Sequence, residues 1–257
     1  MSNFQSHADH AKPPSKLLML LEGRALWELG ALAVAYPLLR TAPRGDGHSV
    51  LVLPGLVASD GSTLALRRFL AEQGYDPHGW KQGRNYGPRP GVEQRMLDGL
   101  LDLHAQSGRK VSVIGWSLGG VYARELARKA PHAVRQVVTL GSPLRGKPTA
   151  TNAWKVYEMA SGRSAHDSEG HRSAEAPPVP STAIFSRTDG IVAWQCSLES
   201  PGPHTESIEV AGSHCGLGHN PAALYAIADR LTQPEGQWAP FDCSGLRKPF
   251  YGSARLH

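Results

Sequence analysis

The fold is decided by one stretch, residues 111–120, which reads VSVIGWSLGG. Its β-branched apolar start predicts a buried strand, and the residues from Leu118 onward favour a helix. The G-x-S-x-G pattern between them predicts a sharp strand-to-helix turn that exposes the Ser117 hydroxyl. Gly115 and Gly119 suit such a turn, because a side chain at either position would crowd the neighbouring strand or helix. We therefore expect Ser117 to be a nucleophile.

Apolar runs and helical patterns alternate on both sides of this turn. Strands are predicted at residues 49–53, 110–115, 136–140, 181–186 and 207–210, the last of these closing the series. Helices are predicted at residues 16–35, 63–73, 92–106, 118–129 and 221–231. Pro37 should end the first helix, because proline disfavours helical geometry in the residue before it. The sequence therefore predicts an α/β fold, with a mostly parallel sheet and helices on both faces.

Length and the alternation predict a single main domain with two flanking segments. The 257 residues suit one α/β domain, which we place at residues 49–233. Residues 1–48 are expected to form a polar tail and an amphipathic helix, and residues 234–257 a C-terminal tail. Residues 144–180 interrupt the alternation at the edge of the sheet where active sites lie. We interpret them as a small cap or lid, with a mobile insertion as the alternative.

Composition narrows the classes of partner. The net charge of +5 comes without a Lys/Arg cluster interleaved with aromatics, which argues against nucleic acid as a partner. The cysteines Cys196, Cys215 and Cys243 have no zinc-type spacing, so no metal site is expected. Free thiols in a reducing compartment are the expectation, and a Cys196–Cys243 disulfide stays open. The sequence leaves the oligomeric state undetermined.

The N-terminal apolar stretch does not resemble a signal peptide. Glu22, Arg24 and Glu28 interrupt it, and no cleavage site follows an uninterrupted apolar core. The longest apolar run, residues 29–39, is shorter than the roughly 20 residues that span a bilayer. A cytoplasmic protein is therefore expected, with this helix packed on the domain. A surface-anchoring helix with weak membrane association is the alternative.

A serine hydroxyl needs a base to accept its proton and an acid to orient that base. Asp189 follows the predicted strand at 181–186, and His214 follows the predicted strand at 207–210. Both should therefore lie on loops at the same sheet edge as Ser117. The order serine, acid, histidine is the order found in one large superfamily.

From Ser49 to Leu231 the sequence resembles the α/β-hydrolase superfamily, in particular its small lipase and esterase branch. Four matched places carry the resemblance: Pro54-Gly55-Leu56 at the oxyanion loop, Gly115 to Gly120 at the elbow, Ser186 to Val192 at the acid loop, and Gly212-Ser213-His214 at the histidine loop. The G-x-S-x-G pattern alone is common by chance. All four in order, each after a strand, make a strong signal for this fold.

The resemblance implies a mechanism without cofactor or metal. His214 would deprotonate Ser117, which attacks the acyl carbonyl of a small-molecule ester or lipid. The backbone N–H groups of Leu118 and Leu56 would form the oxyanion hole. Pro54 departs from the family, where histidine commonly precedes the oxyanion glycine, and proline has no N–H to donate.

Other residues could take the same roles. His219 is a rival base, but His214 follows the strand more closely. Asp60 precedes Ser117 and suits a turn, while Glu206 and Glu209 fall in or beside the last predicted strand. Two further residues adjoin the site: Cys215, which we expect to be a small buried residue rather than a nucleophile, and Trp116, which we expect to pack in the core or else to line the acyl pocket.

The sequence thus predicts a carboxylic-ester hydrolase with a Ser117–His214–Asp189 triad. An acyltransferase that uses the same acyl-enzyme is one alternative. A non-catalytic binding protein of the same fold is the other.

Overall fold

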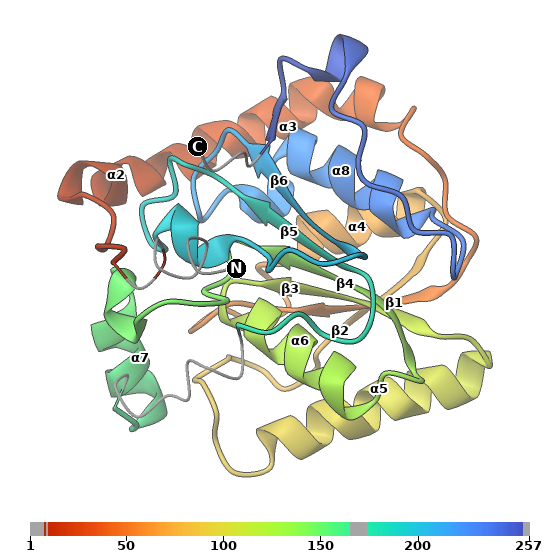
Figure 1. Cartoon of the computed structure of the whole chain (residues 1–257), viewed down its shortest axis with the longest axis horizontal. Coiled ribbons are helices and arrows are strands. Elements are labelled where there is room, and N and C mark those ends of the chain that lie inside the picture. The colour runs from red at the N-terminus through yellow and green to blue at the C-terminus, as the bar shows by residue number, and fades with distance from the viewer. Residues whose placement is uncertain (1–7, 9, 165–173, 254–257) are drawn as a thin grey trace.

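The computed structural model of the chain describes residue 8 and residues 10–164 and 174–253. Its centre is a seven-stranded sheet (Figure 1). The strand order is β2-β1-β3-β4-β5-β6-β7. The strands are β1 (Ser49–Leu53), β2 (Asp76–Gly79), β3 (Val111–Trp116), β4 (Val134–Leu140), β5 (Ser181–Phe185), β6 (Thr205–Val210) and β7 (Tyr251–Ser253). All neighbours pair in parallel except β6 and β7, which are antiparallel. The sheet confirms the predicted α/β class.

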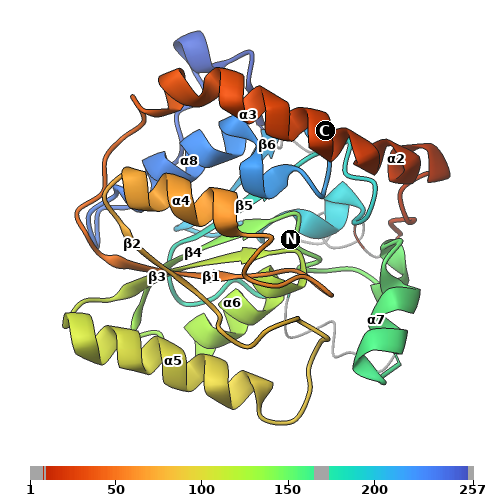
Figure 2. The ribbon, with the colours of Figure 1, turned by 180° about the vertical axis from the view of Figure 1, so that it is seen from behind.

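Helices cover both faces of the sheet, as Figures 1 and 2 show. One face carries α3 (Ala25–Leu39), α4 (Leu64–Glu72) and α8 (Pro221–Leu231), and the other carries α5 (Val92–Ser107) and α6 (Leu118–Lys129). Strands β1, β3, β4 and β5 are buried along their whole length. This burial on both faces explains why their sequences are continuous apolar runs rather than alternating ones.

Three sequence expectations are wrong in detail. Pro37 lies inside α3, which continues to Leu39. Proline has no N–H, so only one hydrogen bond of the last turn is lost, the one to the carbonyl of Ala33. Ala33 is exposed, so water can bind that carbonyl instead. The strand over residues 207–210 is not the last, because β7 follows it within the expected C-terminal tail. The predicted N-terminal helix is divided into α2 (Lys16–Leu20), a 3-10 turn (Leu21–Arg24) and α3.

The expected cap region contains a 3-10 turn (Pro148–Ala150) and the helix α7 (Trp154–Ser161). Residues 165–173 of that region lie outside the described residues. A bridge between Thr151 and Val192 and a hydrogen bond of 2.7 Å from Asn152 N to Ile191 O attach its start to the loop after β5. The region therefore leaves the sheet at the carboxyl end of β4, contacts the loop after β5 there, and enters β5 at that strand's amino end.

The part of the chain that the structure describes contains no helix with the length and apolar character needed to cross a membrane.

Candidate active site

Ser117 occupies the turn between β3 and α6 in a conformation that few residues adopt. Its backbone has φ 54° and ψ −121°, a left-handed region that L-residues other than glycine rarely enter. The turn is held by the Ser117 N–H, which donates to the Leu140 carbonyl at 2.8 Å. A Cβ at Gly115 would collide with the backbone of Gly119, and one at Gly119 would collide with the backbone of Leu53. Close packing therefore requires glycine at both positions, as the sequence indicated.

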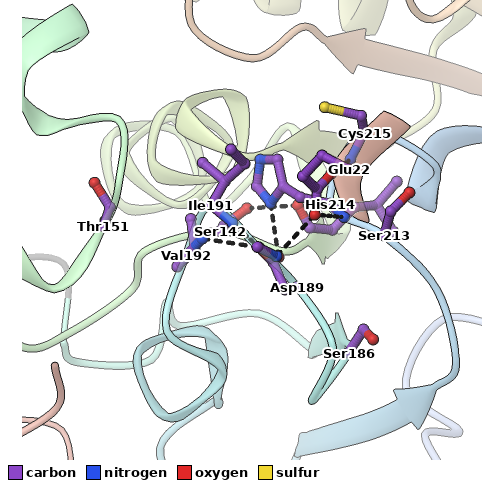
Figure 3. A network of polar contacts seen from close by, with 12 residues as sticks. Glu22, Ser142, Thr151, Ser186, Asp189, Ile191, Val192, Ser213, His214 and Cys215 are labelled. Carbon is purple, nitrogen blue, oxygen red and sulfur yellow. Dashed lines mark hydrogen bonds and ion pairs between the residues drawn. The ribbon is translucent and has the colours of Figure 1, made fainter. Parts of the chain in front are cut away.

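Asp189 and His214 form a buried pair at the same sheet edge (Figure 3). His214 Nδ1 lies 2.7 Å from Asp189 Oδ2. The other carboxylate oxygen accepts hydrogen bonds of 2.8 Å from the N–H groups of Ile191 and Val192. With these three partners the carboxylate has little rotational freedom, so it fixes the orientation of the imidazole.

A glycine after β4 makes room for this pair. Gly141 has φ +53°, and a Cβ there would lie 3.0 Å from both Asp189 Oδ2 and His214 Nδ1. The Gly141 N–H donates to the Ile184 carbonyl at 2.9 Å. The backbone between β4 and the cap region thus passes directly against the acid–base pair.

The surroundings of His214 change its affinity for a proton. Burial acts to lower the pKa of His214, but the Asp189 charge and hydrogen bond, together with the Glu22 charge, raise it above its ordinary value of 6.5. Negative charge beside the ring stabilises the imidazolium that forms when histidine accepts a proton. This is the electrostatic requirement for a general base that works on a serine.

Ser117 lines a large cavity, whose lining does not include Asp189 or His214. The cavity has a volume of about 1120 Å³ and is lined by Ser117, Leu56 and Leu118 and by residues of α5, α6 and α7. Among the described residues, no hydrogen bond joins the Ser117 hydroxyl to His214. Such contacts are often long before substrate binds.

Leu118 and Leu56, the expected oxyanion donors, line the same cavity as Ser117. Leu118 is the first residue of α6, so its N–H has no partner within the helix. Leu56 follows Gly55, where a Cβ would lie 3.2 Å from Ser117 Cβ, so the loop runs directly past the serine. Val57 next to it has φ 54°, which is rare for a β-branched residue.

Asn85, which the sequence analysis did not single out, holds this loop in place. Its side-chain amide donates to the Pro54 carbonyl at 2.9 Å, and its backbone carbonyl accepts from Val57 N at 2.6 Å. Its side-chain oxygen accepts from Gly87 N at 3.0 Å. Pro54, which has no N–H to donate, thus contributes a carbonyl acceptor to the loop.

Glu22, also not singled out by the sequence analysis, binds both the loop that carries Asp189 and the loop that carries His214. Its carboxylate accepts hydrogen bonds from Gly190 N at 2.7 Å, His214 N at 3.0 Å and Cys215 N at 2.8 Å. Figure 3 shows it beside the backbone of the histidine loop. The acid loop and the histidine loop are therefore joined through one side chain from the N-terminal segment.

Glu28 and Arg24 extend these contacts. Glu28 accepts from Ser213 N at 2.8 Å and from Ser213 Oγ at 2.6 Å. Arg24 donates to the Thr188 carbonyl at 2.7 Å. In the sequence, Glu22, Arg24 and Glu28 are visible as charges inside an apolar stretch, which argues against a signal peptide. The same pattern also indicates charged side chains that need buried polar partners.

Solved structures with a similar fold are known. Lipase B of Aspergillus fumigatus superposes with a TM-score of 0.59 at 17% identity, over 77% of this chain and 56% of the lipase. The N-formylmaleamic acid deformylase Nfo of Pseudomonas putida S16 superposes with a TM-score of 0.53 at 16% identity, over 73% of this chain and 94% of the deformylase. The chain has the α/β-hydrolase fold. No family model matches the sequence.

A curated sequence relative of this α/β-hydrolase-fold chain is serine hydrolase BPHL of Mus musculus. The two are 31% identical over 109 residues, which is 38% of this chain and 37% of the mouse protein. The match thus spans little more than a third of the curated relative.

The rival site residues of this α/β-hydrolase-fold chain have other partners. The His219 ring lies 3.0 Å from the Ala25 carbonyl. Asp60 accepts from the N–H groups of Trp80 and Lys81, both at 3.0 Å. Glu206 binds Arg230, and Glu209 binds Arg187.

Trp116 packs in the core, as expected, and its indole N–H donates to the His214 carbonyl at 3.1 Å. The three cysteines are free thiols. Cys215 is exposed rather than buried, which differs from the expectation. Although the residue as a whole is exposed, its thiol is partly shielded from solvent, and this desolvation together with the nearby Glu22 carboxylate raises the pKa of Cys215 to about 12. The thiol therefore stays protonated near neutral pH and is a poor nucleophile.

Proposed function

We propose that the chain is a serine hydrolase that cleaves carboxylic esters through an acyl-enzyme. Ser117 is the nucleophile, His214 the general base and Asp189 the residue that orients the base. The observation that carries the proposal is the buried Asp189–His214 pair, 2.7 Å apart, at the edge where Ser117 occupies its high-energy turn. Serine, acid and base in this chain order and on this fold support acyl transfer.

The reaction has two halves. His214 takes the Ser117 proton as the hydroxyl oxygen attacks the acyl carbonyl, and it then gives that proton to the leaving alcohol. Water, deprotonated by His214, next attacks the acyl-enzyme and releases the acid together with free Ser117. The N–H groups of Leu118 and Leu56 stabilise the oxyanion in both halves, and loss of one such donor costs about 3 kcal/mol in other serine hydrolases.

The lining of the cavity supports lipophilic esters as the substrate class. Val121, Tyr122, Trp154 and Tyr157 contribute apolar and aromatic surface to the cavity, whose lining also includes charged side chains such as Glu93 and Lys129. Sites for small molecules combine such surface with a few polar groups that fix orientation. A cavity of about 1120 Å³ has room for a long acyl chain.

The test is hydrolysis of a series of p-nitrophenyl esters of increasing acyl length, combined with labelling by a fluorophosphonate probe. Wild type should hydrolyse the esters and incorporate the probe, and Ser117→Ala should do neither while keeping its thermal stability. Ser62→Ala is the matched control, because Ser62 lies in a loop where its hydroxyl donates to the Ser59 carbonyl. Turnover by Ser117→Ala, or labelling of another residue, would refute the proposal.

The same assay distinguishes the alternatives. Repetition with an added alcohol acceptor separates hydrolysis from acyl transfer, since a transferase forms the new ester even in water. Wild-type protein that neither turns over nor takes up the probe would indicate a binding protein.

A further inference from the structure

The N-terminal segment exposes an unusual amount of apolar surface. We call the outward-facing side of residues 17–38 the apolar strip. Its large side chains are Leu17, Met19, Leu20, Leu21, Leu26, Trp27, Leu29, Val34 and Leu38. Trp27 is 83% exposed, Val34 84% and Leu20 80%. Single exposed apolar residues are ordinary, but a contiguous set of this size on one segment marks an interaction surface.

The charges of this segment point the other way. Glu22, Arg24 and Glu28 are the only charged residues between Lys16 and Arg40, and each binds a catalytic loop on the inner side. The inner side also packs Leu32 and Leu39 into the core. In the expected amphipathic helix the charged side would face solvent. Here the charged side chains face the domain, and the side that faces solvent is apolar.

The apolar side of a helix is normally covered by packing. In α3 only the side toward the domain is covered, by α8 and the turn at Leu217–His219. Figures 1 and 2 both show α2 and α3 along the outside of the molecule. The apolar strip thus has the composition of a buried surface, but none of the described residues of this chain packs over it.

The ends of the strip indicate what covers it. Lys12 and Lys16 are exposed at one end, and Arg40 and Arg44 at the other. Packed symmetrically on a second copy, these cations would meet like charges, whether the two helices ran parallel or antiparallel. A lipid layer with acyl chains below anionic headgroups can bury the apolar side chains of the strip and also pair with the cations at its ends.

We propose that the apolar strip docks this protein on the surface of an anionic lipid bilayer. Trp27, Leu20 and Val34 enter the boundary between headgroups and acyl chains, while the four cations contact lipid phosphates. The strip begins beside the cap region, because Asn152 donates to the Pro14 carbonyl at 3.1 Å. Docking therefore places the start of the cap region near the lipid. The binding of lipid does not depend on the proposed esterase chemistry.

Co-sedimentation with vesicles tests the proposal in the full chain carrying Ser117→Ala, so that no lipid is consumed. Vesicles of phosphatidylcholine alone are compared with an equal mixture of phosphatidylcholine and phosphatidylglycerol. We expect binding to the mixture, weakening with salt, and much less binding to phosphatidylcholine. A failure of the proposed esterase activity would leave this result unaffected.

Two charge variants form a matched pair. Lys12→Gln, Lys16→Gln and Arg40→Gln together remove three cations at the strip. Lys81→Gln, Lys110→Gln and Lys129→Gln remove three cations elsewhere, so each variant lowers the net charge from +5 by the same three units. At about 1 kcal/mol per cation near an anionic surface, the first variant should bind about 100-fold more weakly. The second should bind nearly as wild type does.

Substitutions within the strip test the apolar contribution. Trp27→Ser with Val34→Ser should lower binding at least about tenfold without a change in melting temperature, because both side chains are exposed. Trp27→Phe should keep binding but lose the blue shift of tryptophan emission that vesicles induce in wild type. Equal binding by the two charge variants, or no binding to anionic vesicles, would overturn the proposal. A dimer in sedimentation equilibrium that Trp27→Ser dissociates would instead assign the strip to a second copy.

Discussion

Replacing Glu22 by glutamine separates the structural from the electrostatic role of the N-terminal segment. The carboxylate accepts three backbone hydrogen bonds, from Gly190, His214 and Cys215, and is 9% exposed. Glutamine has nearly the same shape, but its NH₂ group can only donate. At least one of the three N–H groups must therefore face another donor, and the others lose a charged acceptor.

The cost in stability follows from these contacts. A buried N–H left without an acceptor costs about 1–3 kcal/mol, and a hydrogen bond to a neutral acceptor is weaker than one to a charged acceptor. We expect Glu22→Gln to lose about 2–3 kcal/mol of unfolding free energy. For a chain of this size that corresponds to a melting temperature lower by about 4–12 °C.

The electrostatic effect has a defined sign. The Glu22 charge helps to raise the pKa of His214 above 6.5, so its removal lowers that pKa. The base is active when neutral, and activity therefore rises with pH through the pKa of His214. The acid limb of the kcat/KM profile should move to lower pH in Glu22→Gln. The attraction between the Glu22 charge and protonated His214 also stabilises the folded state. This contribution is present while His214 is protonated, and it is lost as pH rises through the pKa of His214 in the folded protein.

The assay is ester hydrolysis across a pH series, with thermal melting of the same samples. Glu28→Gln is the matched control from the same segment, because Glu28 accepts from Ser213 rather than from His214. It should lose stability but leave the acid limb close to its wild-type position. An acid limb that stays in place or moves to higher pH in Glu22→Gln would refute the reasoning, whatever the loss of stability.

Three further predictions concern the site itself. Asp189→Asn should lower kcat of ester hydrolysis by about 10⁴-fold, because the imidazole loses the acceptor that fixes its tautomer; a small loss would contradict the triad. Gly141→Ala should lower both kcat and melting temperature, since its Cβ would lie 3.0 Å from Asp189 and His214 at φ +53°; unchanged kinetics would show that the pair tolerates the methyl group. Asn85→Ala should cost about 2–4 kcal/mol of stability, measured by denaturant unfolding, because buried groups at Pro54 and Gly87 lose their partners. It should also lower kcat more than it changes KM, since Leu56 shifts.

Local patterns in the sequence were enough for the frame of the fold. Residues 111–120 predicted a strand, a turn and a helix, because the periods of a buried strand and a helix differ and the turn needs its glycines. The same reasoning predicted that Asp189 and His214 follow their own strands. Parallel strands end at one sheet edge, so the sequence could predict that these residues approach Ser117.

The tertiary structure decided what surrounds that edge. Glu22 reaches the His214 N–H across 192 positions of sequence, and Asn85 reaches the Pro54 carbonyl across 31. The fold likewise placed β7 beside β6 and continued α3 through Pro37. Periodicity shows which residues are buried or exposed, but a buried polar group must find a partner wherever packing brings one. For that reason the candidate nucleophile, base and acid could be read from the sequence, whereas the side chains that hold their loops could be found only in the folded chain.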